Sequence, residues 1–466
     1  MAVEHDSRGW WQEEAGFVEP REALGGEVSA DVAIVGGGYT GMWTAWLVNE
    51  LEPEANVVLL EAERCGAGPS GRNGGFVNAM WFSLPTLRRR FGDGPALQVA
   101  RAAQDAVEAI GRWCEDQGVD AWYRAGGYLQ VSTAPAHDDA WRTAAEACAQ
   151  LGVPDACRAL EGSEVRRRCD SPLFRSGAFY PAAATVQPAR LALGLRSRLI
   201  ERGVRVFERT RVQGVRPGGD GVTIEAAGGR VRARTAVLAA GPELAAHRTL
   251  RRRLTVASSH MVITEPVPDV IDELGWRGGE CITDSRAMVH YFRTTPDDRI
   301  AFGWGGGRVV PGARNGGRAE VDPEVVRQVE RDLVKFFPGL RGRRVEHAWG
   351  GPIDVSPTHL PVVGSLRSER VHYAFGYTGN GVGPARLAGR ILASLALDRR
   401  DSHTRLALVE PPAVKVPPEP LRYVGGSIVR RALLRRERLE EEGRRPDPVT
   451  RAVAGLPERI GIHIGR

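Results

Sequence analysis

The sequence predicts an α/β fold, and one stretch near the N-terminus carries most of that prediction. An apolar run over residues 31–35 predicts a buried strand, and a glycine-rich turn, residues 36–41, follows it directly. Residues 42–51 predict a helix, and residues 56–60 predict a second strand that ends at Glu61. Together these elements form a complete βαβ unit of about thirty residues, which is typical of a Rossmann-like domain that binds a dinucleotide.

The residues of this turn have distinct predicted roles. Gly36 permits the tight turn, Gly38 lets a pyrophosphate approach the backbone at the helix N-terminus, and Gly41 lets the helix pack on the strand. Glu61 is placed to accept a hydrogen bond from a ribose hydroxyl. Because the strands, glycines and acid occur in register, we interpret the unit as a nucleotide site rather than an ordinary strand–turn–helix.

The remaining pattern extends the α/β prediction. Amphipathic spacing predicts helices over residues 97–118 and 323–337, and short apolar runs predict strands over 204–207, 222–224 and 237–240. After residue 397, closely spaced prolines predict a stiff linker, and residues 427–442 predict a basic helix. We interpret that helix as a solvated helix docked on its parent domain. A contact with a partner protein, a membrane or a nucleic acid is the alternative.

Composition excludes several classes of protein. The chain has 466 residues, 42% hydrophobic and 26% charged, unlike a disordered or collagen-like chain. No apolar run approaches the ~18 residues of a membrane-spanning helix, and the acidic start does not resemble a secretory signal. Six scattered cysteines without a Cys-x-x-Cys pair argue against a zinc cluster and favour a cytoplasmic location.

Charge is unevenly distributed along the chain. Residues 421–466 hold eleven Arg against six acidic residues, so five of the six net positive charges lie in this segment. The core motifs are therefore close to neutral, which does not favour a nucleic-acid partner. All but two of the 63 basic residues are Arg, the exceptions being Lys335 and Lys415. Few residues are therefore available to act as a lysine base.

Two further glycine-rich segments predict that the bound ligand extends beyond the nucleotide held by the βαβ unit. Between Glu61 and Gly75 small residues let the backbone run close to a flat, extended ligand. Residues 376–383 read Gly-Tyr-Thr-Gly-Asn-Gly-Val-Gly and open a helix that extends to Leu395. The N-terminus of that helix can stabilise the negative charge of a reduced flavin ring.

With these motifs the sequence resembles the D-amino-acid oxidase superfamily of FAD-dependent oxidoreductases, which includes glycine and sarcosine oxidases. The resemblance covers about residues 31–397 and rests on DVAIVGGGYTG, GAGPSGRNGG, VLAAGP, WGG before PVVG, and GYTGNGVG. It implies a Rossmann-like FAD-binding domain, residues 28–85, 185–245 and 346–400. A substrate domain with a large mixed or antiparallel β-sheet is then expected over residues 86–184 and 246–345. Residues 401–466 form the Pro-rich linker and basic tail.

The resemblance also implies that the cofactor is FAD, bound without a covalent bond. In sarcosine oxidases a Cys holds the flavin, and His290 takes that position here, so a histidyl linkage is the alternative. The residues expected to bind FAD are Gly36, Gly38, Tyr39, Thr40, Gly41, Glu61, Ala62, Gly68, Ser70, Gly71, Arg72, Asn73, Gly74, Gly75, Val212, Ala240, Gly241, Gly351, Gly379, Asn380, Gly381 and Val382.

The sequence departs from the family at the residue that binds the substrate carboxylate. Glycine and D-amino-acid oxidases place an Arg four residues after the Trp of the WGG-like segment, where this chain has Ile353. Isoleucine cannot form the bidentate pair with a carboxylate that arginine forms. The departure favours an amine over a simple α-amino acid. It makes the chain most similar to γ-glutamylputrescine oxidases, or to the aminophosphonate oxidoreductases of the superfamily.

Four residues are candidates for the substrate site: His260, Tyr291, Arg293 and Trp349. Arg293 is placed to bind an anionic substrate group or to form a surface salt bridge, and Tyr291 to orient an amine or to cover the flavin edge. Trp349 fits core packing as well as a substrate contact. His260 is either a satisfied polar residue or the cation that activates oxygen, because neither lysine lies in a flavin motif.

The function implied by this resemblance is that of a flavin-dependent amine oxidoreductase. A hydride passes from the carbon beside the amine nitrogen to flavin N5, and the imine hydrolyses. Oxygen is the expected acceptor, giving hydrogen peroxide. One alternative is a dehydrogenase for amines or aminophosphonates that passes electrons to a protein or quinone, and another is a tRNA-modifying flavoprotein. The expected partners are thus a small-molecule amine and an electron acceptor; the sequence sets no oligomeric state.

Overall fold

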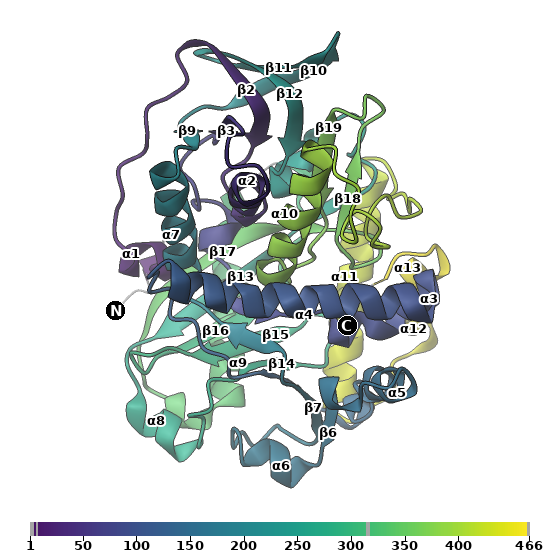
Figure 1. Cartoon of the computed structure of the whole chain (residues 1–466). Coiled ribbons are helices and arrows are strands. Elements are labelled where there is room, and N and C mark those ends of the chain that lie inside the picture. Colours follow the sequence, from purple (N-terminus) through teal and green to yellow (C-terminus); the bar gives the residue numbers. More distant parts are fainter. Residues whose placement is uncertain (1–3, 6–7, 314–316, 464–466) are drawn as a thin grey trace.

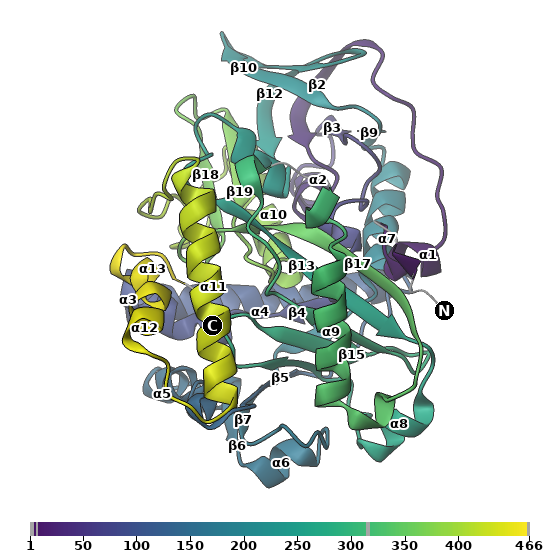
Figure 2. The ribbon, with the colours of Figure 1, turned by 180° about the vertical axis from the view of Figure 1, so that it is seen from behind.

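Two β-sheets organise the chain. The computed structural model describes residues 4–5, 8–313 and 317–463 (Figure 1). An eight-stranded sheet lies in the upper half of Figure 1 and a nine-stranded sheet in the lower half. Helix α4 (Asp93–Asp116) crosses the front at mid-height, and α11 (Leu421–Glu441) lies on the opposite side (Figure 2). Within the described residues no helix is both long and apolar enough to cross a lipid bilayer.

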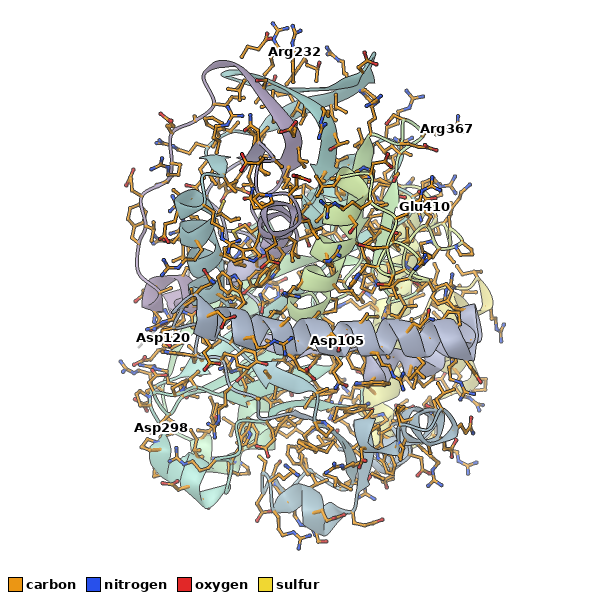
Figure 3. The ribbon with its side chains drawn as sticks, viewed as in Figure 1. Asp105, Asp120, Arg232, Asp298, Arg367 and Glu410 are labelled. Carbon is orange, nitrogen blue, oxygen red and sulfur yellow. The ribbon has the colours of Figure 1, made fainter. Side chains whose placement is uncertain are left out.

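The eight-stranded sheet contains the predicted βαβ unit. Its strand β2 (Gly26–Val35) runs parallel to β3 (Val57–Leu60) and to β12 (Gly229–Leu238). The predicted strand over residues 31–35 is the buried inner half of β2; the outer half is largely exposed and pairs with the outer half of β12, where Arg232 lies (Figure 3). The other strands are β9 (Arg205–Phe207), β10 (Val212–Gly218), β11 (Gly221–Ala226), β18 (Val362–Ser365) and β19 (Val371–Phe375).

Two buried helices lie together against this sheet. α2 (Tyr39–Leu51) follows β2, and α10 (Val382–Ala396) follows β19. A Cβ at Gly389 of α10 would lie 2.8 Å from the Cβ of Trp43 in α2, so the absence of a side chain lets the two helices approach closely. α7 (Pro188–Glu201) also packs on α2. Two helices about 350 residues apart in the sequence, α2 and α10, therefore pack side by side in one layer against the sheet.

The nine-stranded sheet is mixed, and with the Rossmann-like sheet it confirms the predicted fold class. α9 (Pro323–Phe336) packs on this sheet over a cluster of aromatic side chains, including Phe292 and Phe302, whose rings stack 5.2 Å apart. In spatial order the strands are β1 (Glu4–His5), β17 (Val345–Val355), β13 (Thr255–Thr264), β16 (Ile300–Trp304), β15 (His290–Thr294), β14 (Cys281–Asp284), β5 (Tyr128–Val131), β7 (Gly177–Tyr180) and β6 (Arg158–Leu160).

We propose the two interleaved domains with the bounds predicted from the sequence, with one adjustment. β17 pairs within the nine-stranded sheet, although its residues fall in the segment expected in the FAD-binding domain. Smaller elements complete the fold: β4 (Phe76–Asn78), β8 (Ala183–Thr185), α1 (Trp10–Glu14), α3 (Leu84–Phe91), α5 (Arg142–Gln150), α6 (Gly162–Arg166) and α8 (Pro268–Glu273).

The C-terminal segment forms three helices, α11, α12 (Pro448–Ala454) and α13 (Leu456–Arg459). α11 begins at Leu421, six residues before the predicted start at 427. The pair Gly425–Gly426 explains the difference, because glycine is unfavourable in helices and hides a helical pattern. As predicted, the helix is docked: Val429 and Leu433 are buried against Met288, in the loop between β14 and β15 of the substrate domain.

A buried charge network lies beneath α11. His290 Nδ1 is 2.7 Å from Asp284 Oδ2, and its Nε2 is 3.1 Å from Asp332 Oδ2 on α9. Arg286 pairs with Asp284 at 3.0 Å and with Glu441 of α11. Burial alone would lower the pKa of His290, but the two carboxylates outweigh burial and raise it. The network thus joins β14, β15, α9 and α11 through charged hydrogen bonds and ion pairs.

We expect the free energy of unfolding to fall as pH rises through the folded-state pKa of His290. The pKa is raised on folding, so the stabilisation is complete below the unfolded value of about 6.5 and is lost above the folded value. Urea unfolding at pH 6 and pH 9 should show a lower free energy of unfolding at pH 9, and this difference should be largely absent in His290→Gln. An equal difference in the variant would contradict this assignment.

Candidate active site

A cavity of about 1240 Å³ lies where the two sheets meet. The carboxyl ends of β2, β3 and β12 open into it at Val35, Leu60 and Leu238. Strand β13 and strand β17 of the other sheet form the facing wall. Ligands of open α/β sheets bind at the carboxyl ends of the strands, and this volume exceeds the roughly 300–1,000 Å³ of ordinary small-molecule pockets. The cavity is therefore large enough for a cofactor together with a substrate.

The turn between β2 and α2 has a backbone conformation that favours glycine. Gly36 has φ +110°, and a Cβ there would lie 2.5 Å from the carbonyl oxygen of Ala239. A Cβ at Gly41 would lie 1.9 Å from the carbonyl oxygen of Gly36, so helix and turn touch directly. Gly38 instead lines the cavity, and a Cβ there would lie 3.0 Å from Ser70 Oγ. A side chain at Gly38 would occupy space expected for the pyrophosphate.

The N-terminus of α2 presents backbone N–H groups to the cavity. The N-cap residue, Gly38, has no side chain to cap this helix, and Tyr39 N in its first turn donates to Ser70 Oγ at 2.9 Å. Gly37 N donates to Glu61 Oε2 at 2.6 Å. Burial raises the pKa of Glu61, while hydrogen bonds from the backbone oppose that effect. Such a helix end stabilises phosphate, and the acid at the end of β3 suits a ribose.

A second helix N-terminus, that of α10, opens into the same cavity. Gly379, Asn380, Gly381 and Val382 line it, and a Cβ at Gly379 would meet nothing within 4 Å. The loop before α10 is held in place by Asp354 of β17, whose Oδ2 accepts from Gly376 N at 2.5 Å. Burial raises the pKa of Asp354 to about 6. This arrangement directs the positive end of α10 into the cavity.

One hydrogen bond joins the two helix ends. Tyr377 Oη lies 2.8 Å from Thr40 Oγ1 of α2. Burial raises the pKa of Tyr377, although this hydrogen bond partly offsets the effect, so the phenol stays neutral. The two positive helix ends therefore keep a defined separation across the cavity. These features fit FAD, in which a pyrophosphate links the adenosine half to the half that carries the flavin ring.

The structure places most of the residues expected to bind FAD on the cavity wall. The exceptions are Gly41, Gly71, Gly74 and Gly75, which contact neighbouring backbone or side chains instead. A Cβ at Gly75 would lie 2.1 Å from the carbonyl oxygen of Val186, and one at Gly71 would lie 2.2 Å from that of Gly66. These glycines allow close packing behind the wall, so they shape the cavity without lining it.

Of the four substrate candidates, Tyr291 and Trp349 line the cavity. Tyr291 Oη lies 2.8 Å from Ser259 Oγ, and burial raises the pKa of Tyr291 to about 12, so its hydroxyl is neutral at working pH. Trp349 Nε1 donates to the carbonyl oxygen of Arg72 at 2.8 Å. This bond ties the substrate sheet to a loop expected to bind FAD.

His260 and Arg293 lie outside the cavity wall. Side chains of β13 alternate, so Ser259 and Met261 face the cavity and His260 faces the other side of the sheet. Both ring nitrogens of His260 are buried without a hydrogen-bond partner among the described residues, and burial lowers its pKa to about 4. His260 is therefore neutral at working pH, which removes the charge that oxygen activation would use. The twofold alternation of side chains along β13 therefore contradicts the predicted role of His260 at the flavin.

Arg293 is fully buried, and its donors bind backbone carbonyls. Its Nη1 donates to the carbonyl oxygen of Val186 at 2.5 Å, and its Nε donates to that of Thr294 at 3.1 Å. Burial lowers its pKa to about 10, so the group remains charged at neutral pH. In this position Arg293 supports the Gly75 loop, and it forms no salt bridge with any described residue, contrary to the surface salt bridge considered from the sequence.

His290, the other candidate for flavin attachment, does not line the cavity. Its nitrogens bind Asp284 and Asp332, as described above, so neither is placed to bond a flavin. Lys335 pairs with Glu441 of α11 at 2.6 Å, away from the cavity. Ile353, by contrast, lines the cavity, where it stands in place of the carboxylate-binding Arg.

Several residues of the site are not among those predicted from the sequence. Ser259 and Met261 could have been found from the alternation of β13, because they flank His260 on the opposite face. Asp354 carries no local signal, since its partner Gly376 is brought to it by tertiary folding. The C-terminal helices also line the cavity, at Val429 and Leu433 among others, and nothing in their composition indicates this position.

Two glycine substitutions separate folding from cofactor binding. We expect Gly38→Val to fold, because Ser70 can rotate away, but to bind FAD at least about tenfold more weakly, ~1.4 kcal/mol. Gly41→Val should fail to fold stably, because the Gly36 carbonyl cannot move freely. Flavin absorbance per protein and titration of the apoprotein with FAD measure both effects. Gly94→Val, at an open surface position, is the control, and unchanged FAD affinity in Gly38→Val would overturn the placement.

Comparisons with known proteins agree with this geometry. The γ-glutamylputrescine oxidoreductase of Escherichia coli (strain K12) is 28% identical over 406 residues, 84% of this chain and 89% of that protein. The sarcosine oxidase subunit beta of Rhizobium meliloti (strain 1021) is 25% identical over 381 residues, 78% of this chain and 84% of that protein. Glycine oxidase from Geobacillus kaustophilus has a similar fold, with a TM-score of 0.67 and 18% identity over 80% of this chain and 96% of that chain.

The family model described as "FAD dependent oxidoreductase" (DAO) matches residues 31–395. That span contains the glycine turn after β2, the facing walls of the cavity and nearly all of α10. It ends before the linker and the C-terminal helices. The chain belongs to the DAO family of FAD-dependent oxidoreductases.

Proposed function

We propose that this enzyme oxidises amines at the carbon next to nitrogen. The observation that carries the proposal is the set of uncharged side chains that β13, β15 and β17 present to the cavity: Ser259, Met261, Tyr291 and Ile353. A zwitterionic α-amino acid needs a cation for its carboxylate, and Ile353 stands where related oxidases have one. The similarity to γ-glutamylputrescine oxidoreductase supports the same substrate class.

In this reaction the residues of the chain orient the amine, exclude water and stabilise negative charge. Bound FAD supplies the chemistry of two-electron acceptance, at its N5 atom. Tyr291 and Ser259, neutral and hydrogen-bonded to each other, orient the uncharged amine. Trp349 closes the wall against water through its hydrogen bond to Arg72, and the N-terminus of α10 stabilises negative charge in the cavity. The amine loses a hydride, and water then converts the imine to a carbonyl compound and ammonia or a smaller amine.

Oxygen is the proposed electron acceptor, with hydrogen peroxide as the product. Lys335 pairs with α11 and His260 faces away from the cavity, so neither supplies the cation expected to assist oxygen. A protein or quinone acceptor is the alternative.

A cytoplasmic location stays a prediction from the cysteine pattern.

An anaerobic substrate panel tests the substrate class. We expect primary or secondary amines to bleach the oxidised flavin band of the purified holoenzyme, and 2-hydroxy acids to leave it unchanged, because the wall lacks a carboxylate-binding arginine at Ile353. Oxygen uptake compared with reduction of an artificial dye then identifies the acceptor class. Bleaching by hydroxy acids but by no amine would refute the proposal.

The substitution Ile353→Arg should create the missing anion site. Charged hydrogen bonds contribute about 1.5–3 kcal/mol, so we expect benzoate to bind at least about tenfold more tightly than to the unsubstituted enzyme. The shift of the flavin absorption spectrum on titration with benzoate measures this affinity. Ile353→Leu keeps the volume without the charge and serves as the control. Equal benzoate affinity in both variants would show that residue 353 does not face the reacting end of the cavity.

A further inference from the structure

The C-terminal helices lie outside the span matched by the family model, yet they line the same cavity. We propose that residues 421–463, named here the C-terminal wall, form the outer side of the substrate site and select amines with an extended apolar group. This inference rests on the proposed amine substrate. It adds that the C-terminal wall contacts the part of the substrate that lies away from the amine group. Figure 2 shows α11 running along the side of the molecule where the two sheets meet.

One face of α11 is turned to the cavity. Its lining residues recur every three or four positions, which is the spacing of one helical face: Leu421, Arg422, Gly425, Gly426, Val429, Arg430 and Leu433. The intervening positions Val424 and Ile428 are each 50% exposed and face away. A helix that only covered the surface would need no glycine pair, since each mid-helix glycine costs roughly 1 kcal/mol relative to alanine.

The glycine pair is placed where the helix meets the cavity. A Cβ at Gly426 would lie 3.2 Å from Val309, so this residue lets α11 pack closely on the substrate domain. A Cβ at Gly425 would meet nothing within 4 Å, and the residue lines the cavity. Gly425 therefore leaves open a volume that almost any other residue would fill.

Specific contacts anchor the wall to loops that border the site. Arg430 Nε donates to the carbonyl oxygens of Gly306 and Gly307, at 3.0 and 2.5 Å. Glu437 accepts from the backbone N of Met288 at 2.9 Å, three residues before Tyr291. Each contact ties α11 to a loop of the substrate sheet, so the position of α11 is coupled to the site.

The segment after α11 closes a second side of the cavity. Leu456, Pro457, Ile460 and Ile462 line it. The backbone N of His463 donates to the carbonyl oxygen of Pro357, which follows the β17 strand that carries Ile353. At 2.7 Å this bond returns the end of the described chain to the wall of the site.

The chemistry that the wall offers to a substrate is apolar. Arg430 binds the two glycine carbonyls, and Arg422 Nη1 donates to the carbonyl oxygens of Arg251 and Leu254 at 2.9 and 3.1 Å. With these two cations engaged by the protein, the surface facing the cavity is made mainly by Val429, Leu433 and the aliphatic residues of the last segment. A hydrocarbon chain or ring on the amine is the group that gains from burial there.

The test fills the open volume at Gly425. In the holoenzyme, n-alkylamines from butylamine to octylamine are mixed anaerobically with the oxidised enzyme. The dependence of the rate of flavin bleaching on amine concentration gives the apparent dissociation constant, or the shift of the flavin absorption spectrum gives it where an amine binds without bleaching. We expect this constant to fall by up to about fourfold for each methylene buried. Gly425→Trp should abolish this dependence on chain length for the longer amines and leave butylamine unchanged. Val424→Trp, the adjacent outward position, should behave like the unsubstituted enzyme.

The outcomes separate this inference from the proposed function. A chain-length dependence that survives in Gly425→Trp, or that is absent from the unsubstituted enzyme, overturns the inference even where amines bleach the flavin. A dependence that Gly425→Trp removes while no amine bleaches the flavin supports the wall and refutes amine oxidation. Gly425→Leu repeats the test with a smaller side chain.

Discussion

The site depends on how closely the backbone packs at the turn after β2. The carbonyl of Gly36 lies where a Cβ of Gly41 would stand, and the carbonyl of Ala239 lies against Gly36 itself. Only a turn without side chains brings α2 to the edge of the sheet with its N–H groups directed into the cavity. The position of α10 follows from this packing, because Gly389 and Trp43 bring the two helices together.

The facing wall is joined to this nucleotide fold by hydrogen bonds between distant segments. Trp349 binds the carbonyl of Arg72, Arg293 binds that of Val186, and Asp354 binds the N–H of Gly376. Each bond connects a strand of the nine-stranded sheet to a loop next to the cofactor site. A shift of the substrate sheet would therefore move the cofactor loops with it, which keeps the reacting atoms of substrate and cofactor at a defined separation.

Buried charged residues such as His290 and Arg293 stabilise the fold and do not line the cavity. His290 joins Asp284 and Asp332, and Arg293 holds backbone carbonyls. Both residues looked like functional groups in the sequence because the type of a residue says nothing about its partners. The neutral side chains Tyr291 and Ser259, which face the cavity, suit an amine that reacts in its uncharged form.

The sequence by itself determined the features that depend on local order: the βαβ unit, its glycine turn, the second glycine-rich loop and the helix after residue 381. Each of these features needs a backbone conformation or a close approach that only certain residues allow, so those residues predict the local structure. Tertiary structure decided which side of β13 faces the ligand, which excluded His260 from the cavity wall. It also decided that the basic C-terminal helix, whose composition suggested a solvated surface, places Gly425 and Val429 at the cavity. Such placements depend on packing between segments more than a hundred residues apart, which local pattern does not encode.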